Sequence, residues 1–164
     1  MKNTVLFLLV CGLLGTLAYF FLHSSREEQV RCQLDRFCEY VHKKGNEPPL
    51  DSLSRAVRTG KLFSKPCQVY FDNPRVEGRF NRKELVRRIS LARNSFTLLT
   101  LSFHDISIRF PEDNRAHISL TMRIRGHLRG GKSFADVREL VMGMEQADGT
   151  WLISLVKEVQ VLER

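Results

Sequence analysis

The side chains best suited to acid–base chemistry in this sequence are two aspartates, Asp72 and Asp105. A carboxylate can take a proton from a substrate, and a histidine held close to it can share that work. His104 directly precedes Asp105, but adjacent residues of a regular strand point to opposite faces. The sequence therefore predicts no direct cooperation between His104 and Asp105, and both aspartates remain isolated catalytic candidates.

Other catalytic and ligand-binding patterns are missing from the sequence. The cysteines and histidines lack close spacings such as CxxC or HxxxH, so neither a metal nor another cofactor is expected. Gly130 and Gly131 fit a hairpin turn better than a phosphate-binding loop, and nothing resembles a nucleophile elbow. One strand face carries a row of His117, Arg123, Arg125 and His127, which favours a solvent-exposed face.

Basic residues are concentrated in the middle of the chain. Between Arg55 and Arg93, eleven Lys or Arg stand against three acidic residues, so this stretch alone carries a balance of +8. The positive patch is expected on Arg79, Arg82, Lys83, Arg87, Arg88 and Arg93. Such a patch fits an acidic protein partner or anionic lipid head groups, with a solvated surface as the alternative. Nucleic acid is not expected, because aromatic residues for base stacking are not interleaved with these arginines.

The N-terminus carries the most apolar segment. Residues 4–22 include no charge, and as a helix they span about 28 Å, close to the roughly 30 Å hydrocarbon core of a bilayer. A cleaved signal peptide and a buried or interfacial helix are the alternatives, but Tyr19 to His23 are too bulky for a cleavage site. We expect residues 1–22 to be an uncleaved membrane anchor. Lys2 favours a cytoplasmic N-terminus, which places residues 23–164 outside the cytoplasm.

Three helices are predicted after the anchor, over residues 26–44, 51–60 and from 81 onward. Asp51 can cap the second helix, and Asn81 with Glu84 has the spacing of a capping box for the third. The residues expected to be buried are Val30, Leu34, Phe37, Cys38 and Val41 on the first helix, Leu53, Ala56 and Val57 on the second, and Leu85, Ile89 and Ala92 on the third.

The C-terminal part has the pattern of long strands. Four runs, over 95–110, 116–128, 133–146 and 151–162, are separated by short turns, and a shorter strand is predicted over 67–71. Turns this short join antiparallel neighbours. The sequence therefore predicts an α+β domain over residues 23–164, in which helices cover one face of a sheet.

This order of elements resembles the NTF2-like superfamily, which includes ketosteroid isomerase, SnoaL cyclases and scytalone dehydratase. The resemblance covers about residues 26–163, and its most telling pieces are YFDNPRVEGRFNRKELVRRI and DGTWLISLVKEVQVL. It implies a cone of three helices packed on a curved, mainly antiparallel sheet. In isomerase-like members a carboxylate just before the proline is the general base, whereas here Asn73 precedes Pro74 and Asp72 is one place removed. Tyr40 is similar to the helix-one tyrosine that hydrogen-bonds an oxyanion in those enzymes.

These observations predict a non-catalytic, membrane-anchored interaction or assembly domain of the bacterial envelope, facing the periplasm. In architecture it is similar to the VirB8-like subunits of type IV secretion machines. The alternative is a small-molecule-binding protein, or an isomerase- or dehydratase-like enzyme, with a pocket in the cone. An open apolar cavity with two convergent polar groups, such as Tyr40 with Asp72 or Asp105, would favour the pocket. A cone filled by Phe71, Phe103 and Trp151 would favour the outer surface. A homo-oligomer and a disulfide from Cys67 to Cys32 or Cys38 are left open.

Overall fold

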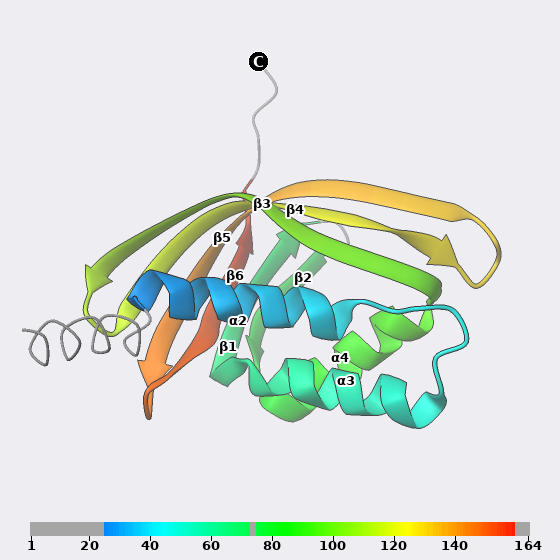
Figure 1. Ribbon diagram of the computed structural model, residues 1–164, viewed down its shortest axis with the longest axis horizontal. Coiled ribbons are helices and arrows are strands. Elements are labelled where there is room, and N and C mark those ends of the chain that lie inside the picture. Colours follow the sequence, from blue (N-terminus) through cyan, green and yellow to red (C-terminus); the bar gives the residue numbers. More distant parts are fainter. Residues whose placement is uncertain (1–24, 73–74, 160–164) are drawn as a thin grey trace, which may run out of the picture.

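A computed structural model describes residues 25–72 and 75–159 of this chain (Figure 1). The elements are α2 (Arg26–Val41), α3 (Pro49–Lys61), β1 (Phe63–Asp72), β2 (Arg75–Phe80), α4 (Arg82–Asn94), β3 (Phe96–Glu112), β4 (Arg115–Leu128), β5 (Ser133–Ala147) and β6 (Thr150–Glu158). The six strands form one sheet in the order β2-β1-β6-β5-β4-β3. Only β1 and β6 pair in parallel among these strands, so the sheet is mixed and mainly antiparallel, as predicted.

The helices lie on the concave side of the sheet. Figure 1 shows β3, β4 and β5 bending over α2, while α3 and α4 lie side by side below it. The second of the four predicted strand runs, over 116–128, forms β4, and buried residues alternate along it at Ala116, Ile118, Leu120 and Met122. Buried Val30 and Leu34 of α2 meet this face. The predicted α+β fold with three helices on a curved sheet is therefore present.

Local capping signals explain where two of the helices begin. Ser25 and Glu28 form a capping box at the start of α2, and Asn81 and Glu84 form the predicted one at the start of α4. Helix α3 begins at Pro49, two residues before the predicted start, because a proline is well tolerated in the first helical turn.

Helix α3 faces the domain with small and polar residues, which corrects one prediction. Ala56 is buried as expected, but Leu53 and Val57 are 52% and 39% exposed. The reason is a close approach between helices at Gly60, where an added Cβ would collide with Val86 of α4. A helix packed so closely through its smallest residues leaves its larger apolar side chains at the surface.

Strand β2 was not predicted from the sequence, which suggested a turn leading directly into the third helix. Its residues RVEGRF lack the apolar alternation of a buried strand, and Phe80 is its buried residue. The strand forms because it pairs with β1, with Val69 opposite Gly78, and lies at the edge of the sheet. Strand β1 also begins earlier than predicted, at Phe63, which pairs with Ile153 of β6.

The anchor predicted over residues 4–22 lies outside the described residues, as does the boundary at residue 22. Residues 25–72 and 75–159 contain no helix long and apolar enough to span a bilayer. In this part of the chain Cys32, Cys38 and Cys67 are free thiols, so Cys67 pairs with neither of the other two.

Candidate functional site

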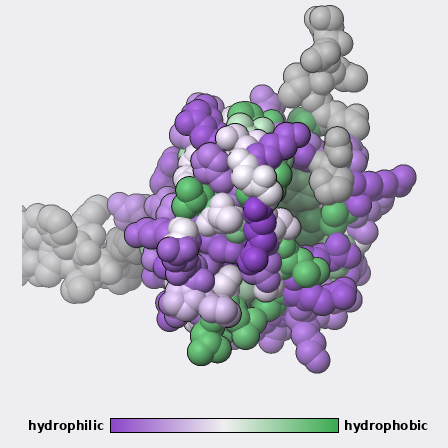
Figure 2. All heavy atoms as spheres, turned by 90° about the vertical axis from the view of Figure 1, so that its right-hand side faces the viewer, coloured by the Kyte–Doolittle hydropathy of each residue, from purple (hydrophilic) through white to green (hydrophobic). Residues whose placement is uncertain are grey.

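The cone contains an apolar cavity of about 490 Å³. Its walls come from α2, α4, the paired residues Phe71 of β1 and Val76 of β2, and the three strands β3, β4 and β5. The lining residues are Phe37, Val41, Phe71, Val76, Ile89, Ala92, Arg93, Phe96, Leu99, Leu101, Met122, Ile124, Phe134, Asp136 and Arg138. Figure 2 looks onto the side at which the β4–β5 hairpin projects, and shows a recess with hydrophobic residues inside, framed by hydrophilic ones.

Aromatic residues close the inner end of the cone without filling the cavity. Phe37 stacks on Phe103 at 5.8 Å and meets Phe63 edge-on at 5.7 Å. Trp151 lies farther away, packed against Phe110. Of the three residues that could have filled the cone, only Phe71 borders the cavity, as part of its wall. The cone is therefore open, which is one of the two features expected for a pocket, whereas Tyr40, Asp72 and Asp105 are absent from its wall.

One side of the cavity carries a network of charged residues. The Arg138 guanidinium donates from Nε to Asp136 Oδ2 at 2.7 Å, and from Nη1 to both carboxylate oxygens of Glu158 at 3.0 and 3.1 Å. The backbone N–H of Asp72 donates to Glu158 Oε2 at 2.9 Å. The Arg138 guanidinium also lies 5.9 Å from the centre of the Phe71 ring. One arginine thus holds two carboxylates, and all three side chains are less than one-third exposed.

A second arginine, Arg93, is anchored in the wall between α4 and α2. Its Nη2 donates to both oxygens of Glu47, and its Nη1 donates to the backbone carbonyls of Tyr40, Val41 and His42. These carbonyls belong to the end of α2, whose last turn has no basic residue of its own. Arg93 therefore supplies the positive charge that a helix C-terminus favours.

Burial decides the electrostatics around Arg93. It lowers the pKa of the Arg93 guanidinium, and the nearby Glu47 carboxylate opposes that shift. Burial likewise lowers the pKa of Lys43, whose Nζ donates to the Arg93 carbonyl at 3.1 Å. Arg93 is 1% exposed, so its placement in the basic surface patch is wrong. Arg93, in the last turn of α4, points into the domain, where its charge pairs with Glu47.

The remaining members of the predicted basic patch lie at or near the surface. Arg79 on β2 and Lys83, Arg87 and Arg88 on α4 are exposed, whereas Arg82 is half-buried. The Arg88 guanidinium lies 4.5 Å from the centre of the Phe80 ring. A positive surface over α4 is therefore present without Arg93.

None of the three predicted catalytic candidates lines the cavity. Tyr40 borders a different recess, between the end of α2 and helix α3. Asp72 follows the cavity-lining Phe71 by one residue and so faces the outer side of the sheet, as strand alternation requires. Asp105 also lies outside, where its Oδ2 accepts from Thr121 Oγ1 at 3.1 Å.

An irregularity in β3 changes the expected relation between His104 and Asp105. Asp105 has a φ of 52°, and the pairing register of β3 with β4 shifts between His104 and Ser107. Thr121 pairs with His104 in register and also donates to Asp105. The bulge therefore brings both side chains to the outer face, where His104 Nε2 lies 2.9 Å from Ser102 Oγ. The expectation of opposite faces holds only for a regular strand.

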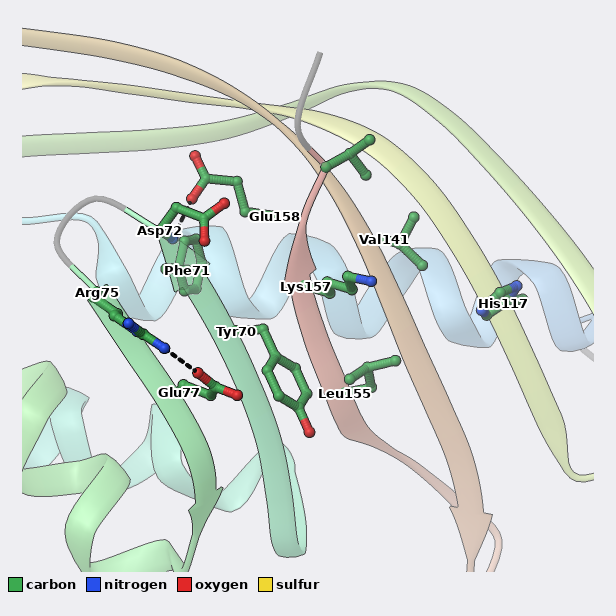
Figure 3. Close-up of a pocket in the computed structure, with 11 residues that line it drawn as sticks. Tyr70, Phe71, Asp72, Arg75, Glu77, His117, Val141, Leu155, Lys157 and Glu158 are labelled. Atoms are coloured by element: carbon green, nitrogen blue, oxygen red, sulfur yellow. Dashed lines mark hydrogen bonds and ion pairs between the residues drawn. The ribbon is translucent and has the colours of Figure 1, made fainter. Parts of the chain in front are cut away.

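The outer face of the sheet has its own recess of about 720 Å³. Figure 3 shows Tyr70, Leu155 and Lys157 beside one another on β1 and β6, with α2 behind the sheet and His117 at the far edge. Arg75 and Glu77 pair with each other at 3.2 Å on the opposite edge. The polar groups are spread around the recess and do not converge on one point.

Residues 25–72 and 75–159 offer little support for metal binding or for a reactive thiol. These ranges contain no cluster of His, Cys, Asp and Glu that could hold a metal ion. Burial raises the pKa of the Cys38 and Cys67 thiols to about 12, with a further contribution from Asp35 for Cys38 and from Glu145 for Cys67. Both thiols therefore stay protonated and unreactive at neutral pH.

Sequence reasoning missed the charged residues of the cone. Asp136 and Arg138 alternate in phase with Phe134 and Leu140, so they stand on the apolar face of β5. Charged residues on the buried face of a strand are the signal that could have identified them. Glu158 lies near the end of the described chain and had no such signal.

Comparisons with solved structures place this architecture in a known class. A proposed scytalone dehydratase from Novosphingobium aromaticivorans matches with a TM-score of 0.68 at 10% identity, covering 83% of this chain and 84% of that one. A hexachlorocyclohexane dehydrochlorinase of LinA type 3 from Novosphingobium barchaimii matches with a TM-score of 0.64 at 10% identity, covering 81% and 84%. A proposed calcium/calmodulin-dependent protein kinase II association domain from Xanthomonas campestris matches with a TM-score of 0.65 at 11% identity, covering 86% and 91%.

These matches agree on one fold. No family model and no curated protein matches the sequence itself. The chain has the NTF2-like fold, as the order of its elements suggested. Identities this low carry no information about activity, so function has to be argued from the cavity and the surface of this chain.

Proposed function

We propose that this domain is a non-catalytic binding domain that holds an apolar small molecule in its cone. The observation that carries the proposal is the composition of the cavity wall. Twelve of its fifteen lining residues are apolar, and the three charged ones, Arg93, Asp136 and Arg138, are each held in an ion pair. A concave apolar site with a few placed polar groups is typical of small-molecule binding.

The same wall argues against acid–base catalysis. Among its lining residues there is no histidine, cysteine, serine, lysine or tyrosine. Asp136 is the one carboxylate among them, and its Oδ2 already accepts from Arg138 Nε at 2.7 Å. A general base has to lie within hydrogen-bond reach of the proton that it removes, and an oxygen occupied by an arginine is poorly placed for that role. The two neighbours named as a dehydratase and a dehydrochlorinase share the fold of this chain. Among the described residues that line its cavity, no side chain is placed to act as a general base.

The membrane tether remains part of the proposal. Residues 4–22 would hold the cone at a bilayer, in the bacterial envelope with the domain in the periplasm, as in the architecture of VirB8-like subunits. The basic surface over α4 would then be available to a protein partner or to lipid. Both roles are compatible with a cone that binds a ligand, because the cavity and the exposed face of α4 are separate surfaces.

Xenon is a suitable probe for the cone, because it enters dry apolar cavities without needing polar contacts. The full chain, labelled with ¹³C at its methionine methyl groups, would be titrated with xenon in detergent micelles. Met122 lines the cavity, whereas Met142 and Met144 are buried elsewhere. We expect the Met122 signal to shift with xenon pressure while the Met142 and Met144 signals stay in place.

Two variants in which phenylalanine replaces an alanine supply the control. Ala92→Phe adds a ring at a position that lines the cavity, and should abolish the xenon-dependent shift of Met122. Ala135→Phe adds the same ring to an exposed position of β5 that is absent from the cavity wall, and should leave the shift intact. A Met122 signal that ignores xenon in the native chain, or that responds equally in both variants, would refute the proposal.

A further inference from the structure

Helices α3 and α4 carry a group of exposed apolar residues. Leu50, Leu53 and Val57 of α3 are 80%, 52% and 39% exposed, and Leu91 of α4 is 61% exposed. The three residues of α3 follow one another at intervals of three and four positions, which places them along one stripe of the helix. Large aliphatic side chains gathered in this way on a surface indicate a contact site.

Exposed basic residues belong to the same two helices. They are Arg58 and Lys61 on α3, and Lys83 and Arg87 on α4. Within residues 25–72 and 75–159, none of these four side chains forms an ion pair. Their charges are thus directed to solvent and remain available to a partner.

Acidic residues do little to cancel this charge. The Glu84 carboxylate is committed to the capping box at the start of α4, where it accepts from the Asn81 backbone N–H at 3.0 Å. Asp51, in the first turn of α3, is the other acidic residue of the two helices. The outer surface of α3 and α4 is therefore positively charged as well as apolar.

The two helices form one continuous layer. They pack together closely where Gly60 of α3 meets Val86 of α4. Figure 1 shows them side by side beneath α2, on the side of the domain away from the bend of β3, β4 and β5. In Figure 2 hydrophobic residues gather at the lower end of the molecule, over this layer.

We infer that the layer of α3 and α4 docks onto the surface of an anionic lipid bilayer. Helices that lie in the membrane interface combine aliphatic side chains, which enter the acyl boundary, with lysine and arginine, which meet the phosphate groups. The β3–β4 turn offers less attraction, because its Glu112 and Asp113 carboxylates lie in ion pairs with Arg115 and Arg26, so that the charge there is balanced. The unpaired basic side chains of α3 and α4 would be attracted to anionic lipid more strongly.

The expected anchor makes this docking more effective. If residues 4–22 cross the bilayer, only residues 23–25 separate that segment from α2, a distance of about 10 Å when extended. The domain would then stay beside the lipid at a high effective concentration, so that a weak surface attraction is enough to orient it. The docking surface itself does not depend on the anchor, because it consists of residues 50–91.

The docking can be measured with a fluorophore that senses lipid contact. An NBD group would be attached to a single cysteine, introduced as Leu53→Cys in a full chain whose native cysteines are replaced by serine. The chain would be reconstituted into vesicles of phosphatidylcholine, with or without phosphatidylglycerol, that contain lipids with spin-labelled acyl chains. We expect the spin labels to quench the NBD group at residue 53 at least about twofold more strongly when phosphatidylglycerol is present. A second label at Ser119→Cys, on the outer face of β4, should not be quenched in either vesicle.

Charge reversal separates specific docking from general attraction. The variant Arg58→Glu, Lys61→Glu, Arg87→Glu should lose the quenching at residue 53. The matched variant Arg109→Glu, Arg125→Glu, Lys132→Glu makes the same change in net charge at exposed positions outside α3 and α4, and should keep it. Equal loss in both variants would reduce the effect to net charge, and no quenching at residue 53 in the native chain would show that this surface does not enter lipid. Either result would overturn the inference.

The anchor is tested separately from the surface. If alkaline carbonate extracts the chain from vesicles, residues 4–22 do not span the bilayer. Salt-sensitive sedimentation with phosphatidylglycerol vesicles would still report docking by α3 and α4. If the anchor is retained but α3 and α4 do not bind the vesicles, the domain is tethered with this helical layer facing water, and the docking inference is wrong.

Discussion

Arg93 and Glu47 form an ion pair inside the domain, with the two carboxylate oxygens 2.8 and 2.7 Å from one guanidinium nitrogen. The side chains are 1% and 8% exposed. Arg55 approaches the same carboxylate at 3.1 Å. This pair connects α4 to the loop after α2, and Arg93 also borders the cavity. The wall of the cone therefore depends on an interaction between residues far apart in the sequence.

Removing one partner of this pair should destabilise the fold strongly. We expect Arg93→Ala to lower the free energy of unfolding by about 3–5 kcal/mol, because Glu47 and the carbonyls at the end of α2 would lose their buried cation. Urea unfolding followed by circular dichroism measures this loss. The control is Arg75→Ala, which breaks an ion pair with Glu77 in which Arg75 is 83% exposed, and should cost at most about 1 kcal/mol. Similar losses for the two variants would contradict this account of Arg93.

The charged network of Arg138 should behave as a unit. Arg138→Leu alone leaves Asp136 and Glu158 without their cation, so we expect a loss of about 2–4 kcal/mol in stability. Adding Asp136→Leu and Glu158→Gln should recover most of that loss, since no uncompensated carboxylate then remains beside the cavity. Thermal unfolding of the native, single and triple variants makes the comparison. A triple variant no more stable than the single one would show that the network has little energetic coupling.

The same triple variant tests the proposal that the cone binds a ligand without catalysing a reaction. If the cone only binds, replacing Asp136 and Arg138 by leucine should preserve or strengthen the xenon-dependent shift of Met122, because the wall becomes more apolar. An enzyme that used Asp136 would instead lose turnover of its substrate in the single variant Asp136→Asn. Any reaction that this variant abolishes without loss of stability would refute the non-catalytic proposal.

Thiol reactivity should follow burial. Cys32 is exposed, whereas the pKa of Cys38 and of Cys67 is raised to about 12. At neutral pH we expect Cys32→Ser to remove rapid labelling by a thiol reagent in the described domain, while Cys38→Ser and Cys67→Ser leave it unchanged. Because the raised pKa favours the protonated thiol in the folded state, stability should fall as pH rises from the ordinary value of 9.0 towards 12. Faster labelling of Cys67 than of Cys32 in the folded chain would contradict the burial.

The anchor and its orientation can be tested in a bacterial host. A phosphatase that is active only outside the cytoplasm, fused after Arg164, should be active if residues 4–22 span the membrane with the N-terminus inside. An active cytoplasmic reporter at the same position, beside an inactive phosphatase, would reverse the orientation. Release of a soluble chain that begins after Leu22 would show cleavage in place of an anchor.

Much of the fold could be predicted from local patterns. The capping box of Asn81 and Glu84 and the alternation along β4 depend on residues only a few positions apart, and the structure contains both. Strand β2 was missed because its stability comes from pairing with β1, and its own residues carry little apolar signal. The apolar residues of α3 were assigned to the interior because their spacing alone cannot tell which side of a helix meets the domain.

The sequence by itself determined the helix stripes, the strand alternation, the excess of positive charge and the apolar segment over residues 4–22. The tertiary structure decided which charged residues meet, bringing Arg93 to Glu47 and Arg138 to Asp136 and Glu158. It also decided that the cone stays open. Periodicity and capping depend on neighbours within one or two turns of chain, whereas the shape of a cavity depends on how a curved sheet and three helices close around it. That closure has no local signature.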